Sequence, residues 1–190
     1  MIRVYLAARY SRREELCRYA DDLRALGIEV TSRWLAGNHQ IDDAGLSVEA
    51  KSAERTRFAT EDYADVMAAD WCISFTETPR SSNSRGGRHV EFGAALASGL
   101  RVVVIGPREN VFHCLPDVEV YPGWAEFVEK TRPEMARGLW PSREDLDAVR
   151  SVRRRWDAGG VTQTEMAAEY GVAGCTVHAI IARRNWSHVQ

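Results

Sequence analysis

The chain has 190 residues, of which 45% are hydrophobic and 27% are charged, and its formal net charge is -2. These values are typical of a globular protein with one ordinary domain and a small second one. The near-neutral charge excludes a protein that coats polyanions with its whole surface, so any nucleic-acid contact must come from a local patch. No apolar run approaches the roughly 20 residues that a bilayer-spanning helix needs, so we expect no membrane partner.

The expected compartment follows from the N-terminus and from the cysteines. The chain begins with a charged, strand-like segment in place of the apolar stretch of a signal peptide. Its four cysteines form no C-x-x-C pair, and none has a histidine at metal-ligand spacing. We therefore expect buried, reduced thiols in a cytoplasmic protein that uses no metal and no organic cofactor.

The first 130 or so residues alternate apolar runs with helical patterns. Strands are expected at 2–8, 28–34, 71–75, 100–105 and 118–121. Helices are expected at 11–26, about 53–69, about 89–98 and 123–131, the first opening with a capping box at Ser11 and Glu14. This alternation predicts an α/β fold with a doubly wound parallel sheet of the Rossmann or flavodoxin type. In such sheets ligands lie beyond the carboxyl ends of the strands, where the polar loops 36–52 and 76–88 fall.

The pattern changes near the end of this unit. Pro133, Gly138 and Pro141 break its regularity. We therefore expect the α/β domain to span 1–132, a linker to span 133–141, and a small helical domain to span 142–190.

The helical tail has the spacing of a helix-turn-helix. A second capping box at Thr162 and Glu165 opens one short helix, and a glycine-containing turn leads to the next helix, at 175–184. The residues expected near the backbone of a bound nucleic acid are Arg183, Arg184, Trp186 and His188. Because the tail is nearly balanced in charge, weak or cooperative DNA binding is one interpretation. The other is a helical bundle that packs on the first domain or mediates oligomerisation.

The segment before the expected helix at 89–98 carries the densest polar signal in the chain. Gly86 and Gly87 allow a sharp turn and a close approach of the backbone to a ligand. Backbone N–H groups that lead into a helix favour an anion. Further donors for a phosphate or a sugar are Ser81, Ser82, Ser84, Arg85 and Arg88. Glu91 then falls in the first helical turn, where the helix field favours its ionised form. It is either a cap or a carboxylate suited to nucleophilic attack.

Three stretches together resemble the nucleoside 2-deoxyribosyltransferase superfamily. They are Val4–Tyr10, Ala69–Phe75 and Gly87–Leu96, and the similarity covers about residues 1–130. The superfamily includes base-exchanging transferases and 2′-deoxynucleoside 5′-monophosphate N-hydrolases. The combination of a strand-one tyrosine, an aspartate before the third strand and a G-x-x-x-E-x-G-x-A helix start is fairly specific, although no single piece is.

The resemblance implies a role for each matching residue. Glu91 would attack C1′ of the deoxyribose and form a glycosyl-enzyme intermediate. Asp70 would contact the base and act as general acid, and Tyr5 would orient Glu91. Paired carboxylates in distinct environments can divide such tasks between the sugar and the leaving base. The N-hydrolases also assign the loop 84–88 to the 5′-phosphate.

Other residues are candidates for the substrate site. Asp62 lies eight residues before Asp70 and would either line the site or carry a solvated helix charge. Trp34 and His39 follow the second strand, where a base could stack, although Trp34 could equally belong to the core. Arg9 follows the first strand and could reach a phosphate.

The resemblance also implies a homo-oligomer, because a neighbouring subunit often completes the site in this family. The loop between Pro107 and Pro116, with Asn110 and His113, is the candidate to act in trans.

Three functions remain open from the sequence. The first is an N-glycosidase that releases the free base from a deoxynucleoside 5′-monophosphate, favoured because the segment before Glu91 is longer and more basic than in a typical nucleoside transferase. The second is a transferase that exchanges bases between deoxynucleosides. The third is a nucleotide-sensing DNA-binding regulator, in which the α/β domain binds a small molecule without turnover and the tail binds DNA.

Overall fold

The chain folds around one parallel sheet. The computed structural model describes residues 2–41, 47, 49–78, 86–136, 143–172 and 174–183. The strands are β1 (Arg3–Ala7), β2 (Glu29–Val30), β3 (Trp71–Phe75), β4 (Arg101–Ile105) and β5 (Val118–Tyr121). They lie in the order β2-β1-β3-β4-β5, and every neighbouring pair is parallel. This is the strand order of flavodoxin-like sheets, so the predicted doubly wound α/β fold is confirmed.

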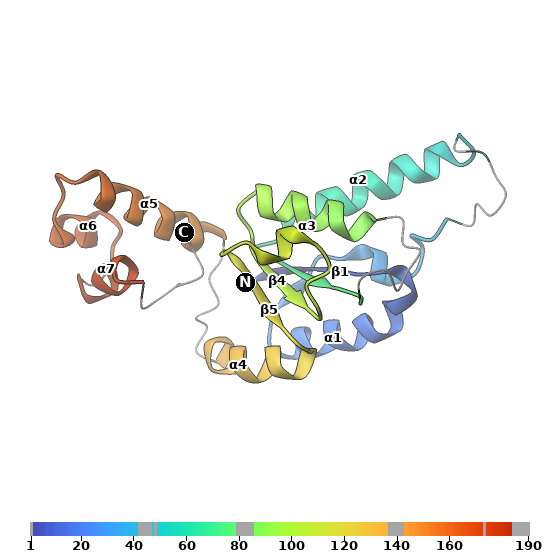
Figure 1. Ribbon diagram of the computed structural model, residues 1–190, viewed down its shortest axis with the longest axis horizontal. Coiled ribbons are helices and arrows are strands. Elements are labelled where there is room, and N and C mark those ends of the chain that lie inside the picture. Colours follow the sequence, from blue (N-terminus) through green and yellow to red (C-terminus); the bar gives the residue numbers. More distant parts are fainter. Residues whose placement is uncertain are drawn as a thin grey trace.

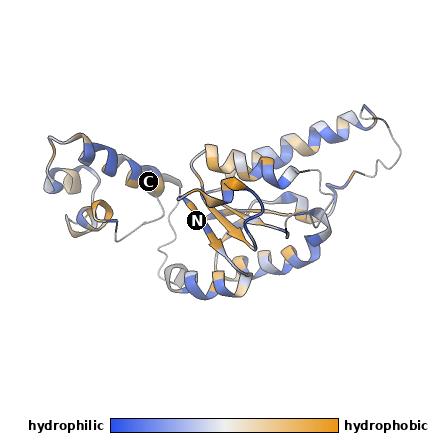
Figure 2. Cartoon of the chain, in the orientation of Figure 1, coloured by the Kyte–Doolittle hydropathy of each residue, from blue (hydrophilic) through white to orange (hydrophobic). Residues whose placement is uncertain are grey.

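Helices cover both faces of the sheet. The helices α1 (Arg13–Ala25) and α4 (Trp124–Ala136) lie on one face, and α2 (Ser52–Ala68) and α3 (Gly87–Ala97) lie on the other (Figure 1). Every residue of β3 and β4 is buried, as expected for apolar runs between two helical layers. The strands carry much of the hydrophobic character of the α/β unit (Figure 2).

The second strand is much shorter than the predicted 28–34. After Val30 the chain leaves the sheet and enters a 3-10 turn, η2 (Arg33–Ala36). Side chains then satisfy the end of β1 in place of a longer β2. The Leu6 N–H donates to Ser32 Oγ at 2.6 Å, and Trp34 Nε1 donates to the Leu6 carbonyl at 2.9 Å. These long-range contacts of side chains with the backbone of β1 take the place of further pairing, and β2 ends at Val30.

Of the two predicted capping boxes, one is wrong and one is confirmed. At Ser11 the chain forms a 3-10 turn, η1 (Tyr10–Arg12), and α1 begins at Arg13 without a side-chain cap. At the second position, the Thr162 N–H donates to Glu165 Oε2 at 2.8 Å, and the Glu165 N–H donates to Thr162 Oγ1 at 3.2 Å. Because Ser11 does not cap α1, its side chain is exposed beyond the carboxyl end of β1.

The tail has three helices with a core of their own. They are α5 (Arg143–Ala158), α6 (Gln163–Glu169) and α7 (Gly174–Ile181). Their buried apolar residues are Leu146, Val149, Val152, Met166, Val177 and Ile180. The preceding α4 continues to Ala136, past the predicted start of the linker at 133. The division into domains and the DNA-binding role of the tail stay predictions.

Two general expectations can be compared with the described residues. All four cysteines are free, but only Cys72 is buried, and Cys114 and Cys175 are exposed, so the expectation of buried thiols is wrong for these two. No helix in the described part of the chain combines the length and apolar character needed to cross a bilayer.

Candidate active site

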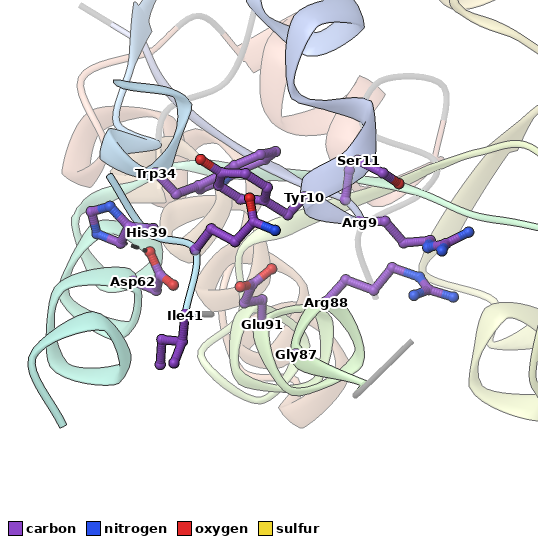
Figure 3. Close-up of a pocket in the computed structure, with 12 residues that line it drawn as sticks. Arg9, Tyr10, Ser11, Trp34, His39, Ile41, Asp62, Gly87, Arg88 and Glu91 are labelled. Carbon is purple, nitrogen blue, oxygen red and sulfur yellow. Dashed lines mark ion pairs between the residues drawn. The ribbon is translucent and has the colours of Figure 1, made fainter. Parts of the chain in front are cut away.

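A cavity of about 440 Å³ opens beyond the carboxyl end of β1. It lies at the topological switch point, where the sheet continues from β1 to β2 on one side and to β3 on the other. Its volume falls in the range of about 300–1,000 Å³ that is usual for small-molecule sites. The lining residues are Ala8, Arg9, Tyr10, Ser11, Trp34, His39, Gln40, Ile41, Asp62, Gly87, Arg88 and Glu91 (Figure 3).

The cavity has two chemically different ends. His39 and Asp62 lie at one end, the guanidinium groups of Arg9 and Arg88 lie at the other, and Glu91 lies between them (Figure 3). The Asp62 and Glu91 carboxyls therefore lie along one half of the cavity, and the positively charged side chains of Arg9 and Arg88 lie along the other half.

Glu91 stands on α3, which begins at Gly87 after Gly86 in a left-handed conformation. It is thus the fifth residue of the helix and belongs to the second turn. The prediction that it lies in the first turn is wrong, and the helix field that was expected to favour its ionised form weakens rapidly beyond that turn.

The surroundings of Glu91 favour its neutral form in the empty cavity. Burial raises its pKa from 4.5 to about 8, and the nearby Asp62 carboxylate adds to this rise. The Tyr5 hydroxyl and the Arg88 guanidinium act in the opposite direction. The expected preference for the ionised form is therefore reversed, because desolvation outweighs the local positive groups.

Tyr5 lies in the middle of β1, where it pairs in register with Cys72 of β3. Its side chain is fully buried, and its hydroxyl has no partner of ordinary hydrogen-bond geometry among the described residues. Burial, and then the charge of Glu91, raise the pKa of Tyr5 well above its usual value. The hydroxyl therefore keeps its proton close to the Glu91 carboxyl, and its orienting role stays a prediction.

Asp62 is the second carboxyl of the cavity. It projects from α2, and burial raises its pKa from 3.8 to about 6, with His39 opposing the rise. The sequence left open whether this residue lines the site or carries a solvated charge. Its place in the cavity beside Glu91 makes it a lining residue.

Asp70 lies elsewhere, which corrects its predicted place beside Glu91. It immediately precedes β3, at the amino-terminal edge of the sheet. Its Oδ2 accepts a hydrogen bond from the Arg3 N–H at 2.8 Å, and its Oδ1 lies 3.5 Å from the Arg3 guanidinium. Among the described residues that line the cavity, Asp70 is absent. Its carboxylate instead binds Arg3 at the amino-terminal edge of the sheet.

The residues predicted to bind phosphate have different surroundings. The side chain of Arg9 makes no ion pair or hydrogen bond within the described part of the chain. Arg88 also lines the cavity, but it is buried and forms an ion pair with Glu109 in the loop after β4, so it is less available than expected. Ser84 and Arg85 lie outside the described residues, as do the tail residues Arg184, Trp186 and His188.

Trp34 and His39 both reach the cavity, but their contacts differ from simple base-stacking surfaces. Trp34 is 5% exposed and belongs to the core. The His39 ring stacks on Phe58, with 4.7 Å between ring centroids, and its Nε2 lies 2.9 Å from Glu61. Neither ring presents two open faces to a ligand.

Two residues of the loop after β4 have partners within their own chain, and the role of this loop in trans stays a prediction. His113 is fully buried, and its Nδ1 accepts a hydrogen bond from the Glu109 N–H at 3.1 Å. Asn110 Oδ1 accepts a hydrogen bond from the Phe112 N–H at 2.9 Å and so caps the short 3-10 turn η3 (Val111–Cys114). Both residues therefore build the loop. Sequence analysis missed Glu109, the partner of Arg88, because no local pattern marks it.

The fold and the cavity define a flavodoxin-like α/β protein with two protonatable carboxyls at its switch point. No family model matches the chain, and no curated protein sequence matches it. Among solved structures, the chain is similar to the CMP N-glycosidase BcmB of Clostridium botulinum. The TM-score is 0.42 and the identity is 24%, over 68% of this chain and 97% of the other. A similarity at this level concerns the fold alone.

Proposed function

We propose that the protein is an N-glycosidase that cleaves the bond between base and sugar in a 2′-deoxynucleoside 5′-monophosphate. The observation that carries this proposal is the order of groups along the cavity. Asp62, Glu91 and Arg9 follow one another in space (Figure 3). A nucleotide has its base, C1′ and phosphate in that same order.

The chemistry divides between the two carboxyls. The Glu91 carboxylate attacks C1′ and forms a glycosyl ester, while the C1′–N bond breaks and Asp62 gives its proton to the departing base nitrogen. Water then attacks C1′ and passes a proton to the Asp62 carboxylate, and the ester bond breaks to restore Glu91. This is the retaining mechanism of glycosidases, in which one carboxyl serves as acid and then as base. The acid of this scheme is Asp62, since Asp70 lies at the other edge of the sheet.

Near neutral pH the two carboxyls hold one proton, which rests on Glu91 in the empty cavity because its pKa is the higher of the two. With pKa values raised to about 8 for Glu91 and about 6 for Asp62, the pair together holds about one proton between these pH values. The reaction needs that proton on Asp62. Positive charge that develops at C1′ stabilises the ionised form of Glu91 and so favours this arrangement as the bond breaks.

A phosphate at the other end has suitable donors. Arg9 has a free guanidinium among the described residues, and the exposed Ser11, two residues later in the sequence, also lines the cavity. The start of α3 at Gly87 adds backbone N–H groups that favour an anion. These groups support a phosphorylated substrate over a nucleoside.

The proposal is tested by chromatography of free base released from each deoxynucleoside monophosphate, from CMP and from the unphosphorylated nucleosides. We expect release from phosphorylated substrates and loss of activity in Glu91→Gln. The matched control is Glu54→Gln, which removes an exposed carboxylate from α2. Base release by Glu91→Gln at the wild-type rate would refute the mechanism.

Base exchange is the alternative outcome of the same assay. It would use the same glycosyl ester, with a second base in place of water. A labelled free base that appears in nucleoside or nucleotide product would identify the protein as a transferase.

The described tail offers only modest support for the DNA-binding regulator. Arg150 Nη1 donates to the Gly99 carbonyl at 2.9 Å, and Arg153 Nε donates to the Ile180 carbonyl at 3.1 Å. Arg155 forms an ion pair with Glu169. Because these cations are engaged within the chain, they contribute little free positive charge to a phosphate backbone. DNA binding and oligomerisation remain predictions, and DNA retention by the full chain would test the first.

A further inference from the structure

Arg88 is an arginine of the cavity whose charge is already matched. Its side chain is only 2% exposed, and it lines the end of the cavity where Arg9 also lies (Figure 3). Its guanidinium forms an ion pair with Glu109, whose side chain is 13% exposed, in the loop after β4. Glu109 is absent from the described residues that line the cavity, so it acts on a ligand there through Arg88.

Glu109 is fixed by contacts other than the one with Arg88. Its Oε2 accepts a hydrogen bond from the Glu77 N–H at 3.3 Å, in the segment after β3. Its own N–H donates to Nδ1 of the buried His113 at 3.1 Å. The residue is therefore held by two segments of the chain at once. A carboxylate held in this way keeps the Arg88 guanidinium in one place at the wall of the cavity.

Arg12 extends this arrangement. Its Nη2 lies 2.7 Å from Glu15 Oε1, and its Nη1 lies 3.6 Å from Glu77 Oε1. Because the Glu77 N–H also binds Glu109, the two arginines and the carboxylates of Glu15, Glu77 and Glu109 form one connected network. Within the described part of the chain, this network has no surplus of positive charge to offer a ligand.

His89, which follows Arg88 on α3, adds no positive charge near neutral pH. Its Nε2 lies 3.7 Å from Glu109 Oε1, but burial and the charge of Arg88 lower the pKa of the His89 ring. Among the described residues at this end of the cavity, Arg9 is therefore the cation that no carboxylate engages. One phosphate group can bind to Arg9 and to the backbone N–H groups at the start of α3.

We propose that Glu109 is a specificity-determining residue, which neutralises Arg88 so that the cavity takes a single phosphate group and disfavours pyrophosphate and the phosphate chains of nucleoside di- and triphosphates. This inference rests on the proposed function, in which Arg9 binds the 5′-phosphate. Each further phosphate group adds negative charge. A chain that reaches Arg88 must either displace the Glu109 carboxylate or lie close to it, and both lower its affinity.

The first measurement needs no variant. Phosphorus NMR titrations of the whole protein, at constant ionic strength, give the dissociation constants of inorganic phosphate and of pyrophosphate. We expect phosphate to bind at least as tightly as pyrophosphate, whereas a simple basic patch prefers the anion of higher charge. Tighter binding of pyrophosphate, or binding of neither anion, would overturn the proposal.

The second measurement repeats these titrations with Glu109→Gln, which removes the charge but keeps a side-chain oxygen for the Glu77 N–H. The guanidinium of Arg88 then gains a charge-assisted contact with the anion, so pyrophosphate should bind about 10-fold more tightly and phosphate should change less. Glu109→Asp keeps the negative charge and should retain the wild-type order of affinities. An unchanged ratio of the two dissociation constants in Glu109→Gln would overturn the proposal.

The matched control is Glu119→Gln, at a second buried pair of arginine and glutamate. Glu119 on β5 is 17% exposed, and its Oε2 accepts a hydrogen bond from Arg101 Nη2 on β4 at 2.8 Å. Both residues are absent from the described lining of the cavity. Glu119→Gln should lower the unfolding free energy about as much as Glu109→Gln but leave the ratio of anion affinities unchanged. An equal change of this ratio in both variants would trace it to lost stability and overturn the role of Glu109.

Activity then distinguishes the two proposals. If the wild type releases base from dCMP or another deoxynucleoside monophosphate, Glu109→Gln should lower the KM for the corresponding di- and triphosphates relative to that for the monophosphate. An active wild type whose KM ratio is the same in Glu109→Gln would refute the role of Glu109 alone. A wild type that releases no base from any nucleotide, but shows the expected anion titrations, would refute the N-glycosidase and leave Glu109 as the residue that sets anion selectivity.

Discussion

Replacement of Glu91 by glutamine should stabilise the protein in alkaline solution, whatever its effect on catalysis. The pKa of Glu91 is raised from 4.5 to about 8 in the folded protein. Between these pH values the folded state therefore binds more protons than the unfolded state, and the stability of the fold falls as pH rises. Glutamine has no proton to lose and avoids this penalty. The stability difference should be small below pH 4.5 and fully developed above about pH 8.

The size of the effect can be bounded from the shift. At about 1.36 kcal/mol per unit, the full rise in pKa corresponds to about 4–5 kcal/mol. Glu91 retains some contact with solvent and shares its proton with Asp62, so we expect about half, or roughly 2 kcal/mol. For a chain of this length that difference corresponds to about 4–8 °C in Tm.

Urea unfolding at pH 5 and at pH 9, followed by far-UV circular dichroism, measures this difference directly. Wild type and Glu91→Gln are compared at each pH, so that other titrating groups cancel. Glu54→Gln serves as the control, because its exposed carboxylate should show no such dependence. Equal effects of Glu91→Gln at both pH values, or a variant that is less stable than wild type at pH 9, would refute the burial argument.

Four further substitutions test the division of roles. Asp62→Asn should lower kcat about 100-fold or more by removal of the acid, whereas Asp70→Asn should leave kcat near wild type and lower the unfolding free energy by about 1–2 kcal/mol through its lost contacts with Arg3; kinetics and urea melts check both. Arg9→Ala should raise KM about 10-fold for nucleotides and leave nucleosides unaffected, which a substrate titration measures. Tyr5→Phe should lower kcat about 10-fold with little change in KM. A rise in KM as large as the fall in kcat would contradict an orienting role.

The fold could be predicted from the sequence because its signals are local. Continuous apolar runs such as Trp71–Phe75 are buried on both faces, and glycines or capping residues separate them from the helices. The second strand could not be bounded in this way. Its length depends on Ser32, whose hydroxyl bonds to the backbone of Leu6, 26 residues earlier in the chain. Such a contact exists only after the two segments meet.

The candidate nucleophile was also predictable as a residue, but its ionisation was not. The glycines at 86 and 87 and the spacing to Glu91 indicate a helix start beside a polar loop. The direction of the pKa shift depends instead on burial and on Asp62, which lies 29 positions away in the sequence. A rule based on the helix field alone predicts a lowered pKa, because the field at a helix N-terminus favours the ionised carboxylate. That field acts mainly on the first turn, and Glu91 lies beyond it.

The exchange of Asp70 for Asp62 follows from the geometry of the fold. Asp70 directly precedes β3, so it must lie at the amino-terminal edge, whereas ligands bind beyond the carboxyl ends of parallel strands. The helix before a parallel strand runs in the opposite direction to that strand. Asp62 lies six residues before the end of α2, about 9 Å at about 1.5 Å per residue, which is more than half of the roughly 16 Å length of a five-residue strand. Asp62 therefore returns to the level of the cavity. A carboxylate about two helical turns before the aspartate that opens a buried strand is thus a stronger candidate for the acid than that aspartate itself.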